Sequence, residues 1–336
     1  MTEPLLEVKN LRVHFPTEDG VVKAVDGVSF SILPGETLGV VGESGSGKSV
    51  TFLTVMGLTN RKSAIVEGEV WFQGQDLLKL PKDELQSIRG SKIGMVFQDP
   101  MTSLHPFYKV GDQISETILA HQKVSRKEAA ERAVDMLRRV GIPKPEERAR
   151  QFPHEFSGGM RQRAMIAMSL SLNPALLIAD EPTTALDVTV QAQILDLIDR
   201  LQEEFNAAVV IITHDLGVVA EHCDDIQVMY AGKIIEEGTA DDIYYRAQHP
   251  YSWGLLRSIP RLDVELERLV PIKGLPPSLI FVPPGCAFHP RCPYAFDRCK
   301  EEIPLLLPTD GHHATACHLP MADRERIFKE QVEVHA

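Results

Sequence analysis

The sequence predicts an α/β fold, and three observations indicate it. An apolar segment at residues 37–41 runs into a glycine-rich loop and then into a helical stretch that begins at Lys48. Two later segments, residues 175–179 and 208–212, are continuously apolar, which is typical of parallel strands covered on both faces. The length of 336 residues is enough for one large domain and an appendage.

The composition excludes several classes of protein. The hydrophobic fraction of 43% and the charged fraction of 24% are those of an ordinary globular protein. A formal net charge of -12 argues against nucleic-acid binding, which needs a basic surface to displace counterions from phosphate. The longest apolar run, residues 207–212, is far shorter than the ~20 residues of a membrane-spanning helix. Because the first residues also lack the pattern of a secretory signal, a cytosolic location is expected.

The domain organisation is predicted from changes of pattern along the chain. Residues 5–33 alternate between apolar and polar and contain several turn pairs, so an antiparallel β region is expected there. From about residue 100 to 172 the strand patterns stop, which predicts an inserted helical subdomain. After residue 257 prolines become frequent. We therefore expect a core domain at residues 1–257 and a loop-rich C-terminal extension at residues 258–336.

Residues 125–141 show a well-marked helix pattern within the predicted subdomain. Ser125 and Glu128 have the spacing of a capping box, and a glycine ends the segment. The period of the apolar residues predicts one buried face, made of Ala130, Val134 and Leu137.

Residues 42–49 match the pattern G-x-x-x-x-G-K-[ST], and they follow a strand and open a helix, as that pattern requires. Glycines there let backbone N–H groups curl around phosphate oxygens, and the helix N-terminus adds positive potential. Lys48 is expected to reach the β and γ phosphates of a nucleotide, and Ser49 to bind Mg²⁺. The predicted nucleotide-binding residues of this loop are Gly42, Ser44, Gly45, Gly47, Lys48 and Ser49.

Two carboxylates, Asp180 and Glu181, follow the apolar segment at residues 176–179. In a phosphate-loop ATPase an acid at this place holds the hydrated metal, so Asp180 is the expected magnesium ligand. Glu181 would then lie beside the γ-phosphate and act as the general base that polarises the attacking water. Taken alone, two acids after a strand are more often a solvated turn, but the upstream phosphate loop favours the catalytic interpretation.

Residues 156–163, Phe-Ser-Gly-Gly-Met-Arg-Gln-Arg, resemble the signature motif of the ABC ATPase family. The serine and the glycines precede a helical run, where a hydroxyl and N–H groups can bind phosphate. The resemblance implies that Ser157, Gly158 and Gly159 bind the ATP held by an opposite subunit. Met160 stands where the family usually has Gln, a substitution also familiar among peptide-permease subunits.

Other positions match the same family in the same order along the chain. Gln98 resembles the Q-loop glutamine that touches metal and water and reports to the membrane partner. Residues 185–187, which end in Asp187, resemble the D-loop, and His214 resembles the switch histidine that contacts the γ-phosphate. Singly, Gln98 also fits a plain surface role and His214 a core role. The shared order therefore carries the resemblance, which covers about residues 5–257.

The resemblance also implies the ligands, the mechanism and the partners. ATP and Mg²⁺ are the expected ligands, and Phe15 is the expected platform for adenine, with His14 as a rival. Two such domains would bind two ATP molecules, each between the phosphate loop of one and the signature segment of the other. Binding closes the pair and hydrolysis reopens it, since the γ-phosphate is the contact that differs between ATP and ADP. The implied partners are a second ABC ATPase subunit, expected to be a paralogue, and two transmembrane permease subunits. The chain would lie on the cytoplasmic face of the membrane against these permease subunits. An extracytoplasmic substrate-binding protein would be an indirect partner.

Four cysteines crowd the last fifth of the chain, and their spacing differs from the paired C-x2-C of zinc ribbons. The segment, with His-Pro-Tyr at residues 249–251 before it and Pro-Arg-Cys-Pro at residues 290–293 within it, resembles the C-terminal extension of oligopeptide and dipeptide permease ATPases. Some members of that group carry an iron–sulfur cluster there. The order of expectation is a [4Fe–4S] cluster, then Zn²⁺, then unligated cysteines. The candidate ligands are Cys286, Cys292, Cys299 and Cys317.

The resemblance of the extension favours peptide import as the function of this ATPase. Related importers carry nickel or other small solutes. Import of such a solute stays an alternative, because the ATPase subunit does not touch the cargo. A non-transport ABC ATPase that acts on DNA or ribosomes is a second alternative. Such proteins usually have tandem cassettes, long coiled coils or basic linkers, and the sequence contains none of these.

Overall fold

The computed structural model describes residues 3–99, 103–184, 186–259 and 271–332. The chain forms two compact units, one of residues 1–32, 37–78 and 212–336 and the other of residues 33–36 and 79–211. Both units combine strands with helices, so the predicted α/β class is confirmed. Within the described residues, every helix falls short of the length or the apolar character that a bilayer-crossing helix needs.

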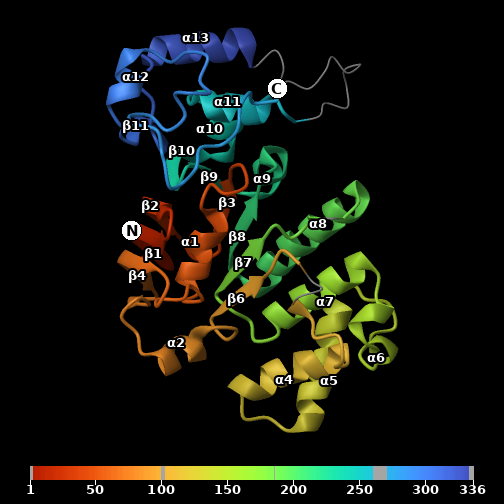
Figure 1. Cartoon of the computed structure of the whole chain (residues 1–336). Helices are drawn as coiled ribbons and strands as arrows, with labels where there is room; N and C mark the ends of the chain where they lie inside the picture. The colour runs from red at the N-terminus through yellow and green to blue at the C-terminus, as the bar shows by residue number, and fades with distance from the viewer. Residues whose placement is uncertain (1–2, 100–102, 185, 260–270, 333–336) are drawn as a thin grey trace. The chain divides into compact units, whose positions relative to one another are not determined.

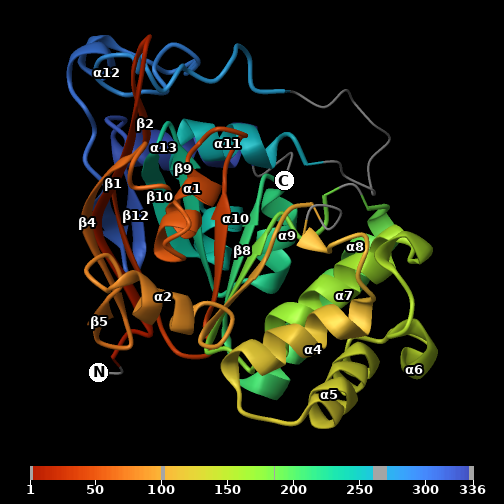
Figure 2. The same cartoon turned by 60° about the horizontal axis from the view of Figure 1, so that its bottom comes forward.

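An antiparallel sheet opens the first unit, as predicted for residues 5–33 (Figure 2). Strand β1 (Leu6–Thr17) pairs with β2 (Gly20–Ile32) from Leu6 opposite Ile32 down to Thr17 opposite Gly20. The other edge of β1 pairs with β4 (Ile65–Phe72), which pairs in turn with β5 (Gln75–Asp76). Apolar residues of β1 are buried in alternation with polar exposed ones, which is why this segment forms a half-covered strand.

The first unit also contains the strands β11-β12-β10-β9-β3 in that spatial order. Strand β3 is buried at all of its positions and runs parallel to β9. Strand β10 pairs antiparallel with β9 on one side and with β12 on the other. These strands span Thr37–Val41 (β3), Asp225–Tyr230 (β9), Lys233–Thr239 (β10), Leu307–Asp310 (β11) and His313–Thr315 (β12). The helices of this unit span Lys48–Val55 (α1), Leu216–His222 (α9), Ala240–Tyr245 (α10), Pro250–Leu256 (α11), Asp297–Glu301 (α12) and Met321–Gln331 (α13).

The second unit contains the parallel pair β6 (Ile93–Val96) and β7 (Leu176–Asp180), with most of β8 (Ala208–Thr213) next to β7. All positions of β6, β7 and β8 are buried, so the two continuously apolar segments were correctly predicted as covered strands. The α-helices of this unit span Lys82–Ile88 (α2), Val110–His121 (α4), Arg126–Arg139 (α5), Pro145–Arg148 (α6), Gly158–Leu170 (α7) and Val188–Phe205 (α8), and a 3-10 turn spans Pro153–Glu155.

Helices α4, α5, α6 and α7 gather in one group (Figure 1), and the described residues from 103 to 172 contain no strand. The predicted subdomain begins at residue 100, which lies outside the described residues. Helix α5 begins after its N-cap Ser125, whose Oγ accepts a hydrogen bond from the backbone N–H of Glu128 at 3.1 Å. The predicted apolar face of this helix was right at Leu137 and wrong by one position at Ala130 and Val134, since the buried residues are Ala129, Ala133, Met136 and Leu137. The predicted division at residue 257 stays a prediction.

Candidate functional site

The phosphate loop lies in the first unit between β3 and α1, and its glycines have the backbone angles that the loop needs. Gly42, Gly45 and Gly47 have φ values of 157°, 79° and 105°. A Cβ at Gly42 would lie 2.3 Å from the backbone oxygen of Met229, and one at Gly47 would lie 2.3 Å from that of Ala24. Both distances are far below van der Waals contact, so the neighbouring strands leave room only for glycine at these positions.

Lys48 is folded into the same loop. The residue is 5% exposed, and its Nζ donates to the backbone oxygens of Gly42 at 2.7 Å and Glu43 at 3.0 Å. Lys48 also opens helix α1, whose N-cap is Gly47. The loop therefore combines a buried ammonium with the positive end of a helix, and both attract phosphate. Ser49, the predicted magnesium ligand, follows on the same helix and is half-buried.

Glu181 follows β7 in the second unit and has an unusual backbone conformation. Its φ is 46°, a left-handed angle that costs a non-glycine residue about 1–2 kcal/mol. Gln98, which is exposed after β6, donates from Nε2 to Glu181 Oε2 at 2.7 Å, and Thr184 Oγ1 lies 2.8 Å from the same oxygen. These two bonds fix the orientation of the Glu181 carboxylate. Asp180 ends β7 and is 7% exposed.

Ser157 and the glycines after it begin helix α7 in the second unit. Ser157 is the exposed N-cap, and its Oγ accepts from the backbone N–H of Met160 at 3.3 Å. A Cβ at Gly159 would lie 2.9 Å from Cγ1 of Val190, so this loop packs tightly on helix α8. Asp187 caps α8 by accepting from the backbone N–H of Val190 at 3.0 Å. The predicted signature and D-loop residues thus line one surface cavity of about 530 Å³, which includes Ser157, Gly158, Gly159 and Asp187.

Several other predicted residues lie in the first unit. Phe15 is half-buried on β1, and the ring of His14 beside it lies 3.5 Å from the carboxylate of Asp26. His214 is exposed between β8 and α9, and Ser44 is exposed in the phosphate loop. Ala185, the first residue of the predicted D-loop, lies outside the described residues.

The four C-terminal cysteines lie in the first unit near helix α12. The backbone N–H of Cys286 donates to the backbone oxygen of Cys299 at 2.8 Å. Burial and, to a smaller extent, the neighbouring thiolates raise the pKa of Cys292 to about 12 and the pKa of Cys317 to about 11. The thiols of Cys292 and Cys317 are therefore protonated near pH 7. Within the described residues, however, no three Cys, His, Asp or Glu side chains are arranged to hold a metal ion. The donor chemistry fits a metal site, but the arrangement does not support the expected iron–sulfur or zinc site.

Sequence reasoning missed a contact between the cysteine segment, residues 286–299, and the phosphate loop. Arg291 donates from Nη1 and Nη2 to the two carboxylate oxygens of Glu43, at 2.5 and 2.9 Å. The hydrogen bonds with Glu43 raise the pKa of Arg291 further above its usual value. Tyr251 is fully buried, and its hydroxyl accepts from the backbone N–H of Glu43 at 2.7 Å. Both Arg291 and Tyr251 belong to the short motifs noted in the C-terminal sequence, although their contact with a loop more than 200 residues away has no sequence signal.

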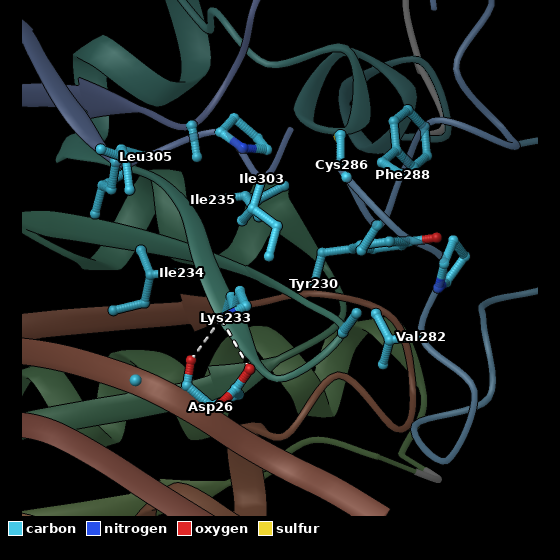
Figure 3. A pocket seen from close by; sticks show the side chains of 18 of the residues that line it. Asp26, Tyr230, Lys233, Ile234, Ile235, Val282, Cys286, Phe288, Ile303 and Leu305 are labelled. Carbon is cyan, nitrogen blue, oxygen red and sulfur yellow. Dashed lines mark hydrogen bonds and ion pairs between the residues drawn. The ribbon is translucent and has the colours of Figure 1, made fainter. Parts of the chain in front are cut away.

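A cavity of about 500 Å³ lies beside the cysteine segment within the first unit. Asp26 and Lys233 form an ion pair of 2.9 Å at one end, while Cys286 and Phe288 lie at the other (Figure 3). The rest of the lining is largely apolar and includes Ile234, Ile235, Val282, Ile303 and Leu305.

A buried polar cluster around Glu236 supports helix α11 and therefore the position of Tyr251. Glu236 is 0% exposed and accepts from Ser252 Oγ at 2.5 Å and from the backbone N–H of His249 at 3.1 Å, and it pairs with the His313 ring at 2.9 Å. His249 caps α11 by accepting at Nδ1 from the backbone N–H of Tyr251 at 3.0 Å. Burial, as the main cause, lowers the pKa of His249 to about 4, so this ring is neutral near pH 7.

Two family models match the chain, "ABC transporter" over residues 25–184 and "Oligopeptide/dipeptide transporter, C-terminal region" over residues 235–299. The chain is 52% identical over 321 residues to the oligopeptide transport ATP-binding protein OppD of Escherichia coli, an alignment that covers 96% of this chain and 95% of that protein. It is also 52% identical over 318 residues to the dipeptide transport ATP-binding protein DppD of Bacillus subtilis, with 94% and 95% covered.

Solved structures show the same fold. A dimeric, post-hydrolysis structure of the ATP-binding cassette MJ0796 bound to ADP and Pi has 30% identity and a TM-score of 0.63, covering 70% of this chain and 98% of that one. The structure of cbiO1 from Clostridium perfringens, part of the ABC transporter complex cbiONQ, has 29% identity and a TM-score of 0.62, covering 73% and 92%.

Proposed function

Because this chain belongs to the family of oligopeptide and dipeptide transport ATP-binding proteins, we propose that it binds and hydrolyses ATP to power the import of peptides. The phosphate loop is the observation that carries ATP binding, since Lys48 is buried among the backbone oxygens of a loop that tolerates only glycine at Gly42 and Gly47. The peptide cargo is supported by the C-terminal region, which matches the transporter-specific family model.

Each predicted residue has a role in the proposed reaction. Backbone N–H groups of the phosphate loop and the Lys48 ammonium would bind the β and γ phosphates. Glu181 would accept the proton of the attacking water, with its carboxylate oriented by Gln98 and Thr184. His214 would contact the γ-phosphate, and Phe15 would stack on adenine. Magnesium, whose ligands would come from Ser49, Gln98 and Asp180, would neutralise charge that develops on the phosphates.

We propose that the signature segment completes the ATP site of a second ATPase subunit. Ser157, Gly158, Gly159 and Asp187 line a surface cavity at the N-terminus of α7, where a phosphate from another subunit would meet N–H groups and a hydroxyl. The dimeric, ADP-bound cassette structure that this chain resembles supports pairing of this kind. The further partners would be two permease subunits, with this chain peripheral on the cytoplasmic face of the membrane and an extracytoplasmic binding protein acting indirectly.

The proposal is tested by reconstituting the chain with its candidate permease and ATPase partners in lipid vesicles. ATP hydrolysis that rises when the permease subunits and a peptide-loaded binding protein are present, together with peptide uptake, is the expected result. Uptake of nickel but not of peptide would show that nickel, and not peptide, is the cargo. A rate of ATP hydrolysis that does not change with any membrane partner would contradict the transport function.

We further propose that residues 1–257 form the nucleotide-binding domain and that the extension at residues 258–336 holds a metal centre on Cys286, Cys292, Cys299 and Cys317. The support is the chemistry of the donors alone, since four thiols suit an iron–sulfur cluster first and zinc second, whereas the described residues show no three side chains arranged to hold a metal. Purification without oxygen, followed by measurement of iron, acid-labile sulfide and zinc, tests this. About four irons and four sulfides per chain are expected for a cubane cluster. A metal-free, colourless and fully active protein would leave the thiols as plain packing residues.

A further inference from the structure

The C-terminal cysteine segment, defined as residues 286–299, contacts the phosphate loop through one arginine. Arg291 makes two parallel hydrogen bonds with the carboxylate of Glu43, and its Nε donates to the backbone oxygen of Lys273 at 3.1 Å. Its side chain is 5% exposed, whereas that of Glu43 is 27% exposed. A two-pronged geometry of this kind fixes both position and direction, which a single charge contact does not.

Aromatic rings hold the Arg291 guanidinium in place from the protein side. Its central carbon lies 5.9 Å from the ring centre of Tyr230 and 5.9 Å from that of Phe288. These two rings meet edge to face at 5.3 Å, and Phe288 also packs on Tyr251 at 5.4 Å. Figure 3 shows Tyr230 and Phe288 on the same side of the cavity as Cys286. Arg291 is thus positioned by the packing of the cysteine segment on β9 and α11.

Glu43 is held at three places, and each restrains the phosphate loop. Its carboxylate pairs with Arg291, its N–H donates to the Tyr251 hydroxyl, and its carbonyl oxygen accepts from Lys48 Nζ. Glu43 directly follows Gly42, so its carboxylate is a negative charge within the segment that receives a polyphosphate. An unpaired carboxylate within this loop would repel the phosphates of the nucleotide. The repulsion is much weaker when the carboxylate is paired with an arginine.

We propose that Arg291 is a positioning residue for ATP, which neutralises and orients Glu43 so that the phosphate loop binds the nucleotide tightly. The inference rests on the proposed ATP site and adds to it a residue from outside the cassette motifs. In this arrangement the cysteine segment helps to set the affinity for ATP without contacting it. The residue is expected to act on binding, because it contacts Glu43 of the phosphate loop, whereas the carboxylate of Glu181 bonds to Gln98 and Thr184.

The test measures equilibrium binding of ATP and steady-state hydrolysis by the full chain for the wild type, Arg291→Gln, Arg291→Lys, Glu43→Gln and the double variant of Arg291→Gln with Glu43→Gln. Arg291→Gln is expected to raise the Kd and the KM for ATP by about tenfold or more, with kcat within about twofold, because it leaves an unpaired carboxylate beside the phosphates. In the double variant most of this loss is expected to disappear, since the repelling charge is removed as well. Arg291→Lys, which keeps the charge but loses the paired bonds, should fall between.

Arg298→Gln is the matched control, because Arg298 also precedes a cysteine of the same segment but forms an exposed pair with Glu302. It should bind ATP like the wild type. ATP binding by the wild type tests the proposed ATP site itself. A failure of that site can therefore be distinguished from a failure of the role proposed for Arg291. If Arg291→Gln binds ATP normally, or if its weaker binding is unchanged when Glu43→Gln is added, Arg291 has only a structural role and the proposal is overturned. Circular dichroism and thermal melting of each variant identify a loss that comes from unfolding.

Discussion

The phosphate loop and the signature segment both place glycines and a serine at the start of a helix, yet they are built differently. The phosphate loop has left-handed glycines, a buried lysine and restraints on Glu43 from Tyr251 and Arg291. At the signature segment Ser157 is exposed and caps its own helix, and the adjoining cavity lies at the surface. The first combines a buried lysine, restricted glycines and a helix end in one loop, whereas the second presents a hydroxyl, backbone N–H groups, a helix end and Arg163 at a surface cavity.

The difference indicates how binding and pairing are divided within the protein. We expect a single chain to bind ATP through its phosphate loop, because the charge and the backbone geometry are already present there. We expect the donors of the signature segment to gain a ligand only when another subunit brings a phosphate to them. Four changes test this division, from the largest expected effect to the smallest.

Glu181→Gln separates chemistry from binding. The amide keeps the size of the side chain but cannot accept the proton of water, so ATP hydrolysis is expected to fall by about 10²–10⁴-fold while ATP binding stays within about twofold. Phosphate release and equilibrium ATP binding measure the two properties. Glu203→Gln, on the exposed face of α8, is the control and should hydrolyse ATP normally. Full turnover by Glu181→Gln would remove the assignment of Glu181 as the base.

Gly47→Ala tests whether the phosphate loop is as restricted as its geometry indicates. A methyl group there would lie 2.3 Å from the Ala24 oxygen at a φ of 105°, so we expect a loss of about 3 kcal/mol or more in the free energy of unfolding, together with loss of ATP binding. Gly45→Ala meets no atom within 4 Å and should cost about 1 kcal/mol, from its φ of 79° alone. Urea unfolding compares the two, and equal losses would contradict the steric argument.

Gly159→Asp tests the signature segment alone. A carboxylate at this helix start would repel the phosphate of a second subunit, so ATP-dependent pairing is expected to weaken about a hundredfold, while single-chain ATP binding stays within about twofold. Light scattering in the Glu181→Gln background, where ATP persists, measures the pairing. Ser157→Ala, which removes the helix cap without adding charge, should have a smaller effect on pairing. Loss of single-chain binding in Gly159→Asp would break the division between the two segments.

Acidification should loosen the support of the phosphate loop. The pKa of buried His249 is about 4, below the 6.5 of an exposed histidine, so the unfolded chain binds the extra proton first as pH falls. The contribution of neutral His249 to the free energy of unfolding is fully present above about pH 6.5. It is lost as the pH falls from about 6.5 to about 4. From pH 7 to pH 5 the loss is about 2 kcal/mol. His249→Asn keeps an acceptor at the N-cap of α11 and should show a flatter pH dependence of the melting temperature; parallel curves for both proteins would contradict the assignment.

Local patterns allowed the phosphate loop and the strand ends to be predicted from the sequence. The pattern at residues 42–49 specifies both the loop and the helix after it, and β7 carries its carboxylates at its end. Helix α5 was predicted with the right cap and with Leu137 correctly buried, but the other two residues of the predicted face were one position off, because alanine occurs at neighbouring positions and its small side chain gives a weak apolar signal.

Long-range contacts could not be predicted in the same way. The pairing of Arg291 with Glu43 depends on how the C-terminal segment folds back over β9, and the packing of Tyr230 and Phe288 that places the arginine has no local signature. The left-handed backbone of Glu181 is likewise imposed by its surroundings, since glutamate has no preference for that angle. Strands β11 and β12 are too short for an alternation to be recognised.

Strand β12 has a consequence for any shortened form of the protein. It contributes Thr315 and Ala314 opposite Glu236 and Glu237 of β10, so β12 and β11 cover the outer edge of β10 and extend the sheet. Truncation after residue 257 would bare that edge, leave Glu236 without its bond to His313, and create a row of unsatisfied N–H and C=O groups that invites self-association. The excised cassette would therefore tend to aggregate, and soluble expression should require the tail.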